Sequence, residues 1–321
     1  MNNFKKIGLT ALAGSLVATS VYAGEMSVAG SASWRISNHA GTDGGKTMAM
    51  GNQLTFTGGG EMDNGMNVAL SFILDQGDNS VGATKNETTA TGEAPFDSHS
   101  ITLSSDAMGS ITFAGEGASS AQNTLDTTAA GDIWDNTFAS YTAPTNADAN
   151  KVLTWTLPTV MDGLGVTTSY NMSSAAKEGT IGYALTYTGV EGLSVSYGFG
   201  EVGGNTAGTT GAEVTTMKAS FAFGPITAAM SINDYDITGA SNEEQSSYSI
   251  SYSVSDELSV SYGSETHETT GQTTDEEFDQ ISVSYTTGGL TASVSQTNAD
   301  NVNGATNSEQ QKWNVGLSFA F

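Results

Sequence analysis

The sequence predicts an all-β protein, a transmembrane antiparallel β-barrel of about sixteen strands. Many segments of roughly ten residues alternate between apolar and small polar side chains, which is the period of a strand. Short turns alternate with long polar loops between these segments, and the last segment is rich in aromatic residues. After the N-terminal region no segment is apolar for long enough to span a bilayer as a helix, so a membrane form of this chain must be a closed barrel.

The last segment, residues 310–321, has two different faces. One face holds Trp313, Val315, Leu317, Phe319 and Phe321, and the other holds Lys312, Asn314, Gly316, Ser318 and Ala320. A soluble protein rarely exposes such an aromatic row, because an apolar edge invites pairing with other chains. We therefore expect the aromatic face of this strand to lie in lipid.

The N-terminus predicts a cleaved secretory signal peptide over residues 1–23. Lys5 and Lys6 supply the positive start, an apolar stretch covers residues 7–21, and Val21-Tyr22-Ala23 provides the small-residue cleavage site. The predicted organisation is a signal peptide at 1–23 and one barrel domain at 24–321.

Composition narrows the classes of function. The net charge of −25 disfavours nucleic acid as a partner, and the absence of cysteine excludes disulfides and cysteine-based metal or nucleophilic sites. Charged residues are only 13% of the chain, whereas a solvated surface holds about 25%. Small hydroxyl side chains without charge suit the inner wall of a water-filled channel.

Sixteen segments show the alternation of a half-buried strand. They are residues 26–37, 51–62, 66–75, 98–105, 110–117, 150–158, 164–172, 179–188, 193–200, 213–223, 226–235, 246–254, 257–266, 277–286, 290–298 and 310–321. Residues 137–143 are a further candidate, which we assign to the preceding loop because single-chain bacterial barrels have an even strand number. Tight turns such as 63–65 and 287–289 are expected on the periplasmic side and the long loops outside the cell.

The order of these features resembles the Gram-negative general porins. The resemblance rests on the signal peptide, the sixteen segments, a long third loop at 118–149 followed by Leu157-Pro158 and Gly163-Leu164-Gly165, and Phe321. It implies an outer-membrane homotrimer that is a passive, water-filled channel for small hydrophilic solutes and ions. It also implies contact with outer-membrane lipid, and recognition of Trp313, Phe319 and Phe321 by the barrel assembly machinery.

The resemblance further implies that the third loop folds into the lumen and narrows it. Mapped by type and position, the loop acids are Asp126, Asp132 and Asp135, and the wall residues are Arg35, Glu116, Lys218 and Lys312. Because wall cations are few, we expect a weak preference for cations. The alternative is that these aspartates only solvate a surface loop.

Other functions stay open as alternatives. One is a secreted, soluble Ser/Thr/Gly-rich β-protein of the adhesin or surface-layer type, and another is a substrate-selective porin. No catalytic residues can be paired, and His39, His99 and His267 show no metal-ligand spacing and are expected at the solvated surface. We predict no enzyme and no cofactor, although loop acids at 243–244 and 275–277 could hold a divalent cation.

Overall fold

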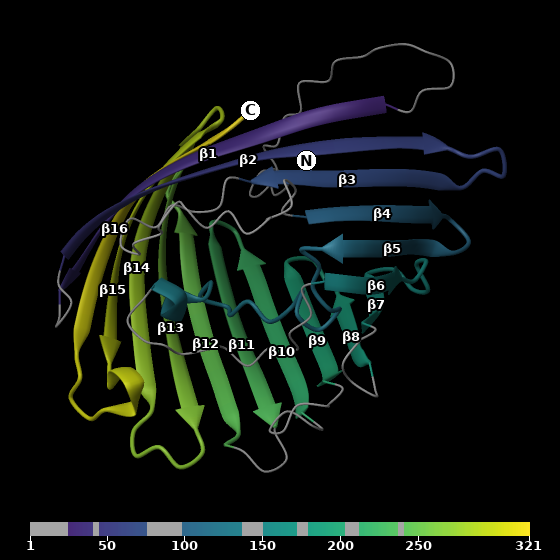
Figure 1. Cartoon of the computed structure of the whole chain (residues 1–321). Coiled ribbons are helices and arrows are strands. Elements are labelled where there is room, and N and C mark those ends of the chain that lie inside the picture. Colours follow the sequence, from purple (N-terminus) through teal and green to yellow (C-terminus); the bar gives the residue numbers. More distant parts are fainter. Residues whose placement is uncertain are drawn as a thin grey trace, which may run out of the picture.

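The computed structural model describes residues 25–40, 45–75, 98–136, 150–171, 179–202, 212–236 and 241–321. Within these residues, sixteen antiparallel strands form one closed barrel (Figure 1). The strands are β1 (Glu25–Ala40), β2 (Gly45–Glu61), β3 (Asn67–Asp75), β4 (Ser98–Ser105), β5 (Gly109–Glu116), β6 (Asn150–Thr156), β7 (Leu164–Asn171), β8 (Thr180–Tyr187), β9 (Leu193–Val202), β10 (Ala212–Phe223), β11 (Ile226–Asp236), β12 (Glu243–Ser253), β13 (Leu258–Thr269), β14 (Glu276–Thr287), β15 (Leu290–Asp300) and β16 (Gln310–Ala320). Two short 3₁₀ helices, η1 (Ile133–Asn136) and η2 (Val302–Gly304), lie between strands.

The sixteen predicted segments are confirmed as the sixteen strands. The predicted signal peptide at 1–23 and the candidate strand at 137–143 lie outside the described residues. None of the described helices has the length and apolar character needed to cross a membrane.

Of the acids at 243–244 and 275–277 that we predicted as loop ligands, all but Asp275 lie in strands instead. Glu243 and Glu244 begin β12, and Glu276 and Glu277 begin β14. The backbone ladder continues past the point where the apolar alternation stops, as in the pairing of Glu244 with Glu268. The described part of the chain contains no group of three or more side chains arranged to hold a metal ion, so this hypothesis gains no support there.

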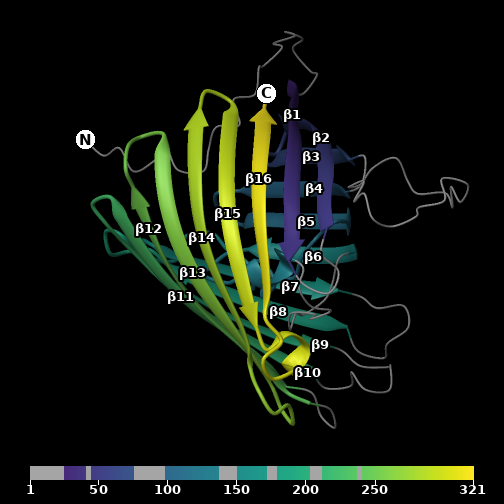
Figure 2. The same cartoon turned by 90° about the vertical axis from the view of Figure 1, so that its left-hand side faces the viewer.

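The barrel closes between the first and last strands. Strand β16 lies between β15 and β1 and pairs with β1 from Ser31 opposite Ala320 to Ala40 opposite Gln311 (Figure 2). Phe321 N donates to Gly30 O at 2.9 Å, and Gly30 N donates to Phe321 O at 2.8 Å. A Cβ on Gly30 would stand 2.5 Å from ring atoms of Phe321, so glycine leaves room there for the aromatic ring.

The predicted two-faced strands are confirmed by the exposure of their side chains. Tyr197, Ile250 and Phe319 are 43%, 50% and 51% exposed on the outer surface. Neighbours of opposite parity are buried inside, such as Ser196 at 9% and Ser247 at 6%. The apolar groups thus surround the barrel and the small hydroxyls line its interior.

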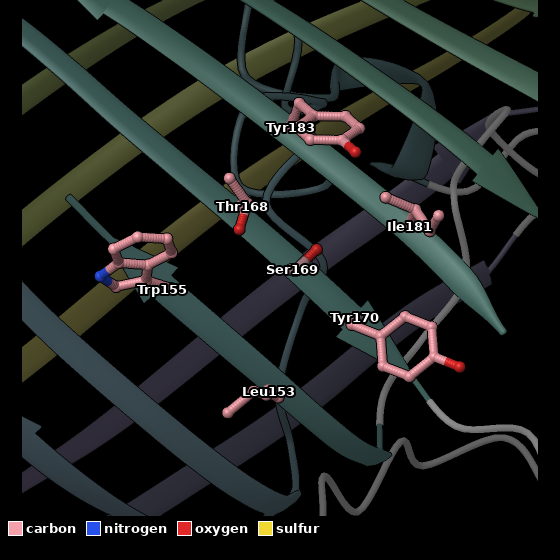
Figure 3. A pocket seen from close by; sticks show the side chains of 7 residues that line it. All are labelled: Leu153, Trp155, Thr168, Ser169, Tyr170, Ile181 and Tyr183. Carbon is pink, nitrogen blue, oxygen red and sulfur yellow. The ribbon is translucent and has the colours of Figure 1, made fainter.

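A shallow groove of about 270 Å³ lies on the outer surface across β6, β7 and β8 (Figure 3). Trp155, Thr168 and Tyr183 are register partners in one row, and the small Thr168 leaves space between the two large rings. The next row holds Leu153, Tyr170 and Ile181. Because the side chains that flank the groove belong to the apolar outer face, it is separate from the interior of the barrel.

Candidate functional site

The described part of the connection between β5 and β6 lies inside the barrel. We call residues 117–136, the described part of this connection, the inner loop; Figure 1 shows it as a teal segment crossing the interior. Ala121 N donates to Ser169 Oγ of β7 at 2.7 Å, and Gln122 Nε2 donates to Thr216 Oγ1 of β10 at 2.8 Å. These partners are buried on the inner wall, so the predicted folding of the third loop into the lumen is confirmed for its described residues, 118–136.

The second half of the inner loop is held by β11, β12 and β13. Ala129 N lies 2.9 Å from Ser231 Oγ and 2.8 Å from Ser247 Oγ. Glu265, which is 1% exposed, accepts a hydrogen bond from Thr128 Oγ1 and another from Trp134 N at 3.0 Å. A short apolar cluster of Ile133, Phe278, Ala299 and Val302 fixes the end of the loop. The loop is therefore attached to the wall along its whole described length.

A buried polar ladder connects the strands beneath the inner loop. Thr216 Oγ1 donates to Asn233 Oδ1 at 2.7 Å, and Asn233 Nδ2 donates to Gln245 Oε1 at 3.1 Å and to Asp126 O at 2.8 Å. Gln245 Nε2 lies 2.9 Å from His267 Nε2. His267 is 1% exposed, so our expectation of a solvated surface histidine was wrong: β13 continues past Thr266 and turns this side chain inward.

Asp126 and Asp132 come together inside the barrel. Both are half-buried. Thr128 N donates to Asp132 Oδ1 at 2.8 Å and Asp132 N donates to Thr128 Oγ1 at 2.7 Å, which closes a turn in which Asp132 has a φ of 53°. The alternative of a surface loop is excluded by these positions. Asp135 lies in η1, and its side chain is outside the described part.

The electrostatics of this pair follow from burial and proximity. Burial, and to a smaller extent the charge of Asp132, raise the pKa of Asp126 from 3.8 to about 6, while Lys218 acts in the opposite direction. Asp126 thus carries a charge that depends on pH near neutrality.

The predicted wall cations have different environments. Lys218 Nζ donates to the backbone oxygen of Thr127 in the inner loop. Lys312 faces inward but is only 2% exposed, so it does not present its charge to open solvent. Arg35 is exposed and faces inward in register with Ala49 and Gly316.

Glu116 lies beside a bulge. The pairing of β4 with β5 shifts between His99 and Ser100, so that His99 lies opposite Glu116 while Ser100 lies opposite Ala114. A bulge interrupts the strict alternation of faces. The predicted inward direction of Glu116 rests on strict alternation, so it stays a prediction.

The wall of β1 and β2 is nearly uncharged on its inner face. Over residues 27–37 and 47–57 its inward positions are Ser27, Ala29, Ser31, Ser33, Arg35, Ser37, Thr47, Ala49, Gly51, Gln53, Thr55 and Thr57. The inner loop binds instead to β7 and β10–β13. A polar lumen remains between an acidic loop on one side and a hydroxyl-lined wall on the other.

A closed sixteen-stranded barrel with a long loop attached inside its lumen is the architecture of a porin. The sequence model of the Gram-negative porin family matches residues 8–321 of this chain. The chain belongs to the Gram-negative porin family. It is therefore a channel protein of the outer membrane and not an enzyme, and the alternative of a secreted soluble β-protein is excluded.

Solved porin structures share the fold at low sequence identity. The anion-selective porin from Comamonas acidovorans has a TM-score of 0.71 and 12% identity, covering 93% of this chain and 100% of that one. The Salmonella typhi OmpF complex with daunomycin has a TM-score of 0.71 and 12% identity, covering 93% and 98%. The trimer form of Vibrio cholerae OmpT has a TM-score of 0.62 and 12% identity, covering 93% and 100%. Among curated protein sequences, none matches this chain.

Sequence reasoning missed Glu265 and the polar ladder. Glu265 lies 137 residues from Thr128 and 131 from Trp134 along the chain, so no local pattern joins them. The one available signal is a long acidic side chain at an inward position that follows small inward residues of the same strand, including Ser261 and Gly263.

Proposed function

We propose that this porin is a general diffusion channel for small hydrophilic solutes and ions, with a weak preference for cations. The observation that carries the proposal is the inner loop, attached to the wall inside the barrel with Asp126 and Asp132 half-buried in it. Such a loop reduces the width available to a solute, and its carboxylates act at close range on a passing ion.

The balance of charge favours cations. Exposed charges more than about 8 Å apart are largely screened at physiological salt, so residues in the lumen outweigh the acidic rim. Lys218 is bound to the loop backbone and Lys312 is buried, which leaves Arg35 as the exposed cation among these three. The Comamonas porin is described as anion-selective, so the shared fold does not decide the sign of the preference.

The lining of the lumen favours passage without chemical selection. A substrate-selective porin needs a ladder of aromatic or basic side chains along the solute path. The inward faces of β1 and β2 offer mainly hydroxyl and small side chains. Solute size and charge are then the properties that the channel distinguishes.

The distribution of tyrosine supports a homotrimer. Tyrosine is enriched where a membrane protein meets the lipid headgroups. On the outer face of the described strands it occurs on β7–β9 and β12–β14, at Tyr170, Tyr183, Tyr187, Tyr197, Tyr248, Tyr252, Tyr262 and Tyr285. The outer face of β1–β5 carries Met48, Met50, Leu70, Phe72 and Phe113 instead. We assign this face to contact between copies of the chain.

Export and assembly are part of the same proposal. Residues 1–23 act as a cleaved signal peptide, which mass measurement of the mature protein would test. Trp313, Phe319 and Phe321 are 37%, 51% and 62% exposed on the outer face, where lipid and the barrel assembly machinery can reach them.

Measurement of the reversal potential in a salt gradient tests the ion preference. Wild type should favour cations, and the double variant Asp126→Asn with Asp132→Asn should reduce that preference, because asparagine keeps the size and the acceptor oxygen of each side chain. Asp256→Asn, in the short turn between β12 and β13, is the matched control and should leave the potential unchanged. A wild-type potential that favours anions would refute the cation preference.

A further inference from the structure

The inner loop passes close to three glycines of the wall. A Cβ built on Gly263 of β13 would stand 2.8 Å from Ala130 Cβ and 3.3 Å from Ala130 Cα. On Gly198 of β9 it would stand 3.3 Å from Gln122 Cγ, and on Gly182 of β8 it would stand 3.2 Å from Ala121 N. These glycines lie beneath successive parts of the inner loop.

Backbone conformation does not require glycine at these positions. Gly182, Gly198 and Gly263 lie within strands, and their φ angles are outside the left-handed range that favours glycine. Glycine inside a strand weakens it, and it commonly marks a place where another backbone approaches closely. Space for the loop is therefore the reason for Gly198 and Gly263, whereas a Cβ on Gly182 would first meet Ser169 Oγ of β7 at 2.6 Å.

Gly263 has the tightest contact with the loop itself. The loop is held on both sides of Ala130, since Ala129 N before it is bound by Ser231 and Ser247, and Trp134 N after it donates to Glu265. The atom that a new methyl group would meet is Ala130 Cβ, which is attached directly to the loop backbone and cannot rotate away.

The strand beneath Gly263 is less able to move than the loop. Strand β13 is paired with β12 and β14 along almost its whole length, with Gly263 opposite Ser249 and Gln280. Carbon atoms in contact prefer a separation of about 3.5–4.0 Å, so a methyl group on residue 263 requires a displacement of about 1 Å. That displacement moves the loop away from the wall, into the lumen.

We propose that Gly263 is a size-determining residue of the channel, because it sets the depth at which the inner loop lies against the wall. Gly182 and Gly198 lie close to the loop nearer its start, at Ala121 and Gln122. The inference rests on the proposed function, in which the inner loop limits the width of the solute path.

The test compares Gly263→Ala and Gly263→Leu with Gly165→Ala and Gly165→Leu. Gly165 lies on the inner face of β7, and its added Cβ would meet only Thr186 O, at 3.8 Å. The measurements are single-channel conductance in a planar bilayer and the permeation of mono-, di- and trisaccharides into liposomes. Folding of each variant is checked by its shift in gel mobility on heating.

We expect the Gly263 variants to lose conductance, with a greater loss for leucine than for alanine, and to slow the trisaccharide more than the monosaccharide. Both Gly165 variants should keep the wild-type values. A folded Gly263→Leu channel with conductance equal to or above that of wild type would overturn the inference. Should that variant fail to fold, equal conductance of Gly263→Ala and Gly165→Ala would overturn it. Failure of the wild type to conduct would instead refute the proposed function.

Discussion

At the residue scale, the proposed cation preference depends most directly on the charge of the Asp126 carboxyl. It lies in the inner loop with Asp132 and Lys218 as its charged neighbours, and its backbone oxygen is held by Asn233. Partial burial makes the charged form of the carboxyl less favourable, while water in the lumen still allows it to ionise.

Cation preference should therefore fall with decreasing pH. Because the pKa of Asp126 is raised to about 6, the carboxyl is negative well above that pH and neutral well below it. The reversal potential should show a loss of cation preference between about pH 7 and pH 5. Asp126→Asn should reduce this change, and a transition of unchanged size in that variant would assign it to another group.

Removal of the Lys218 charge should increase cation preference. A unit charge about 6 Å away in water contributes less than 1 kcal/mol after screening, so Lys218→Met should raise the cation-to-anion permeability ratio roughly twofold. The reversal potential at neutral pH measures this ratio. Lys46→Met on β2 is the control, since Lys46 pairs with Asn38 on the outward parity of the strand. An unchanged ratio in Lys218→Met would show that its charge does not reach the solute path.

Period-two alternation predicted the inward direction of Arg35, Lys218 and Lys312, because every second side chain of a strand with one lipid face must point inward. It did not give the burial of Lys312 or the bond from Lys218 to the loop, because both depend on neighbours distant in the chain. The bulge beside Glu116 could not be predicted either, because it depends on the pairing with strand β4.

At the element scale, the inner loop is held by many contacts with the wall, of which Glu265 makes two. The apolar cluster around Ile133 and the hydrogen bonds to Ser231 and Ser247 also hold the loop. Predicting the loop's inward path required family resemblance, since nothing within residues 118–149 specifies which wall residues receive it. The strands themselves followed from period-two alternation and turn chemistry.

Glu265→Gln should loosen the inner loop without disturbing the barrel. In glutamine, an amide donor replaces one of the two acceptor oxygens. This donor faces either the Trp134 N–H or the Thr128 hydroxyl, so the attachment of the loop to β13 weakens by about 1–3 kcal/mol. We expect more open-channel noise and brief closures in planar-bilayer recordings, with the thermal stability of the barrel unchanged. Glu244→Gln on β12 is the control, and a quiet Glu265→Gln channel would contradict the role of Glu265 in holding the loop.

Two variants of Phe321 can separate recognition of its ring by the assembly machinery from closure of the barrel by its backbone. Deletion of Phe321 removes both hydrogen bonds to Gly30, whereas Phe321→Ala keeps them and removes only the ring. Each bond contributes about 0.5–1.5 kcal/mol, so only the deletion should lower the thermal stability of the folded barrel markedly. Both variants should reduce the amount of protein assembled in the outer membrane. Normal assembly of Phe321→Ala would contradict recognition of the ring.

At the scale of the whole molecule, the outer surface is divided between a tyrosine-bearing region and the apolar face of β1–β5. The fold class and the strand number could be predicted because a closed barrel repeats one simple pattern sixteen times. Assembly could not be predicted in the same way, because both lipid and a second copy of the chain favour apolar residues. The position of the tyrosines on the folded barrel distinguishes the two regions.

Two phenylalanines test the proposed trimer face. Phe72 of β3 and Phe221 of β10 are 37% and 48% exposed on the outer surface. An aromatic side chain at a subunit interface commonly contributes more than about 1 kcal/mol, so Phe72→Ala should lower the temperature at which trimers separate into folded monomers. Phe221→Ala should leave that temperature unchanged. Equal effects of the two substitutions would contradict the assignment of the β1–β5 face.

A planar-bilayer recording of the detergent-purified mature protein tests directly whether the inner loop narrows a conducting channel. We expect stepwise openings grouped in threes, with a modest cation preference that decreases when Asp126 and Asp132 are both neutralised. Folded protein that inserts without conducting, or a conductance indifferent to both aspartates, would contradict a channel narrowed by the inner loop.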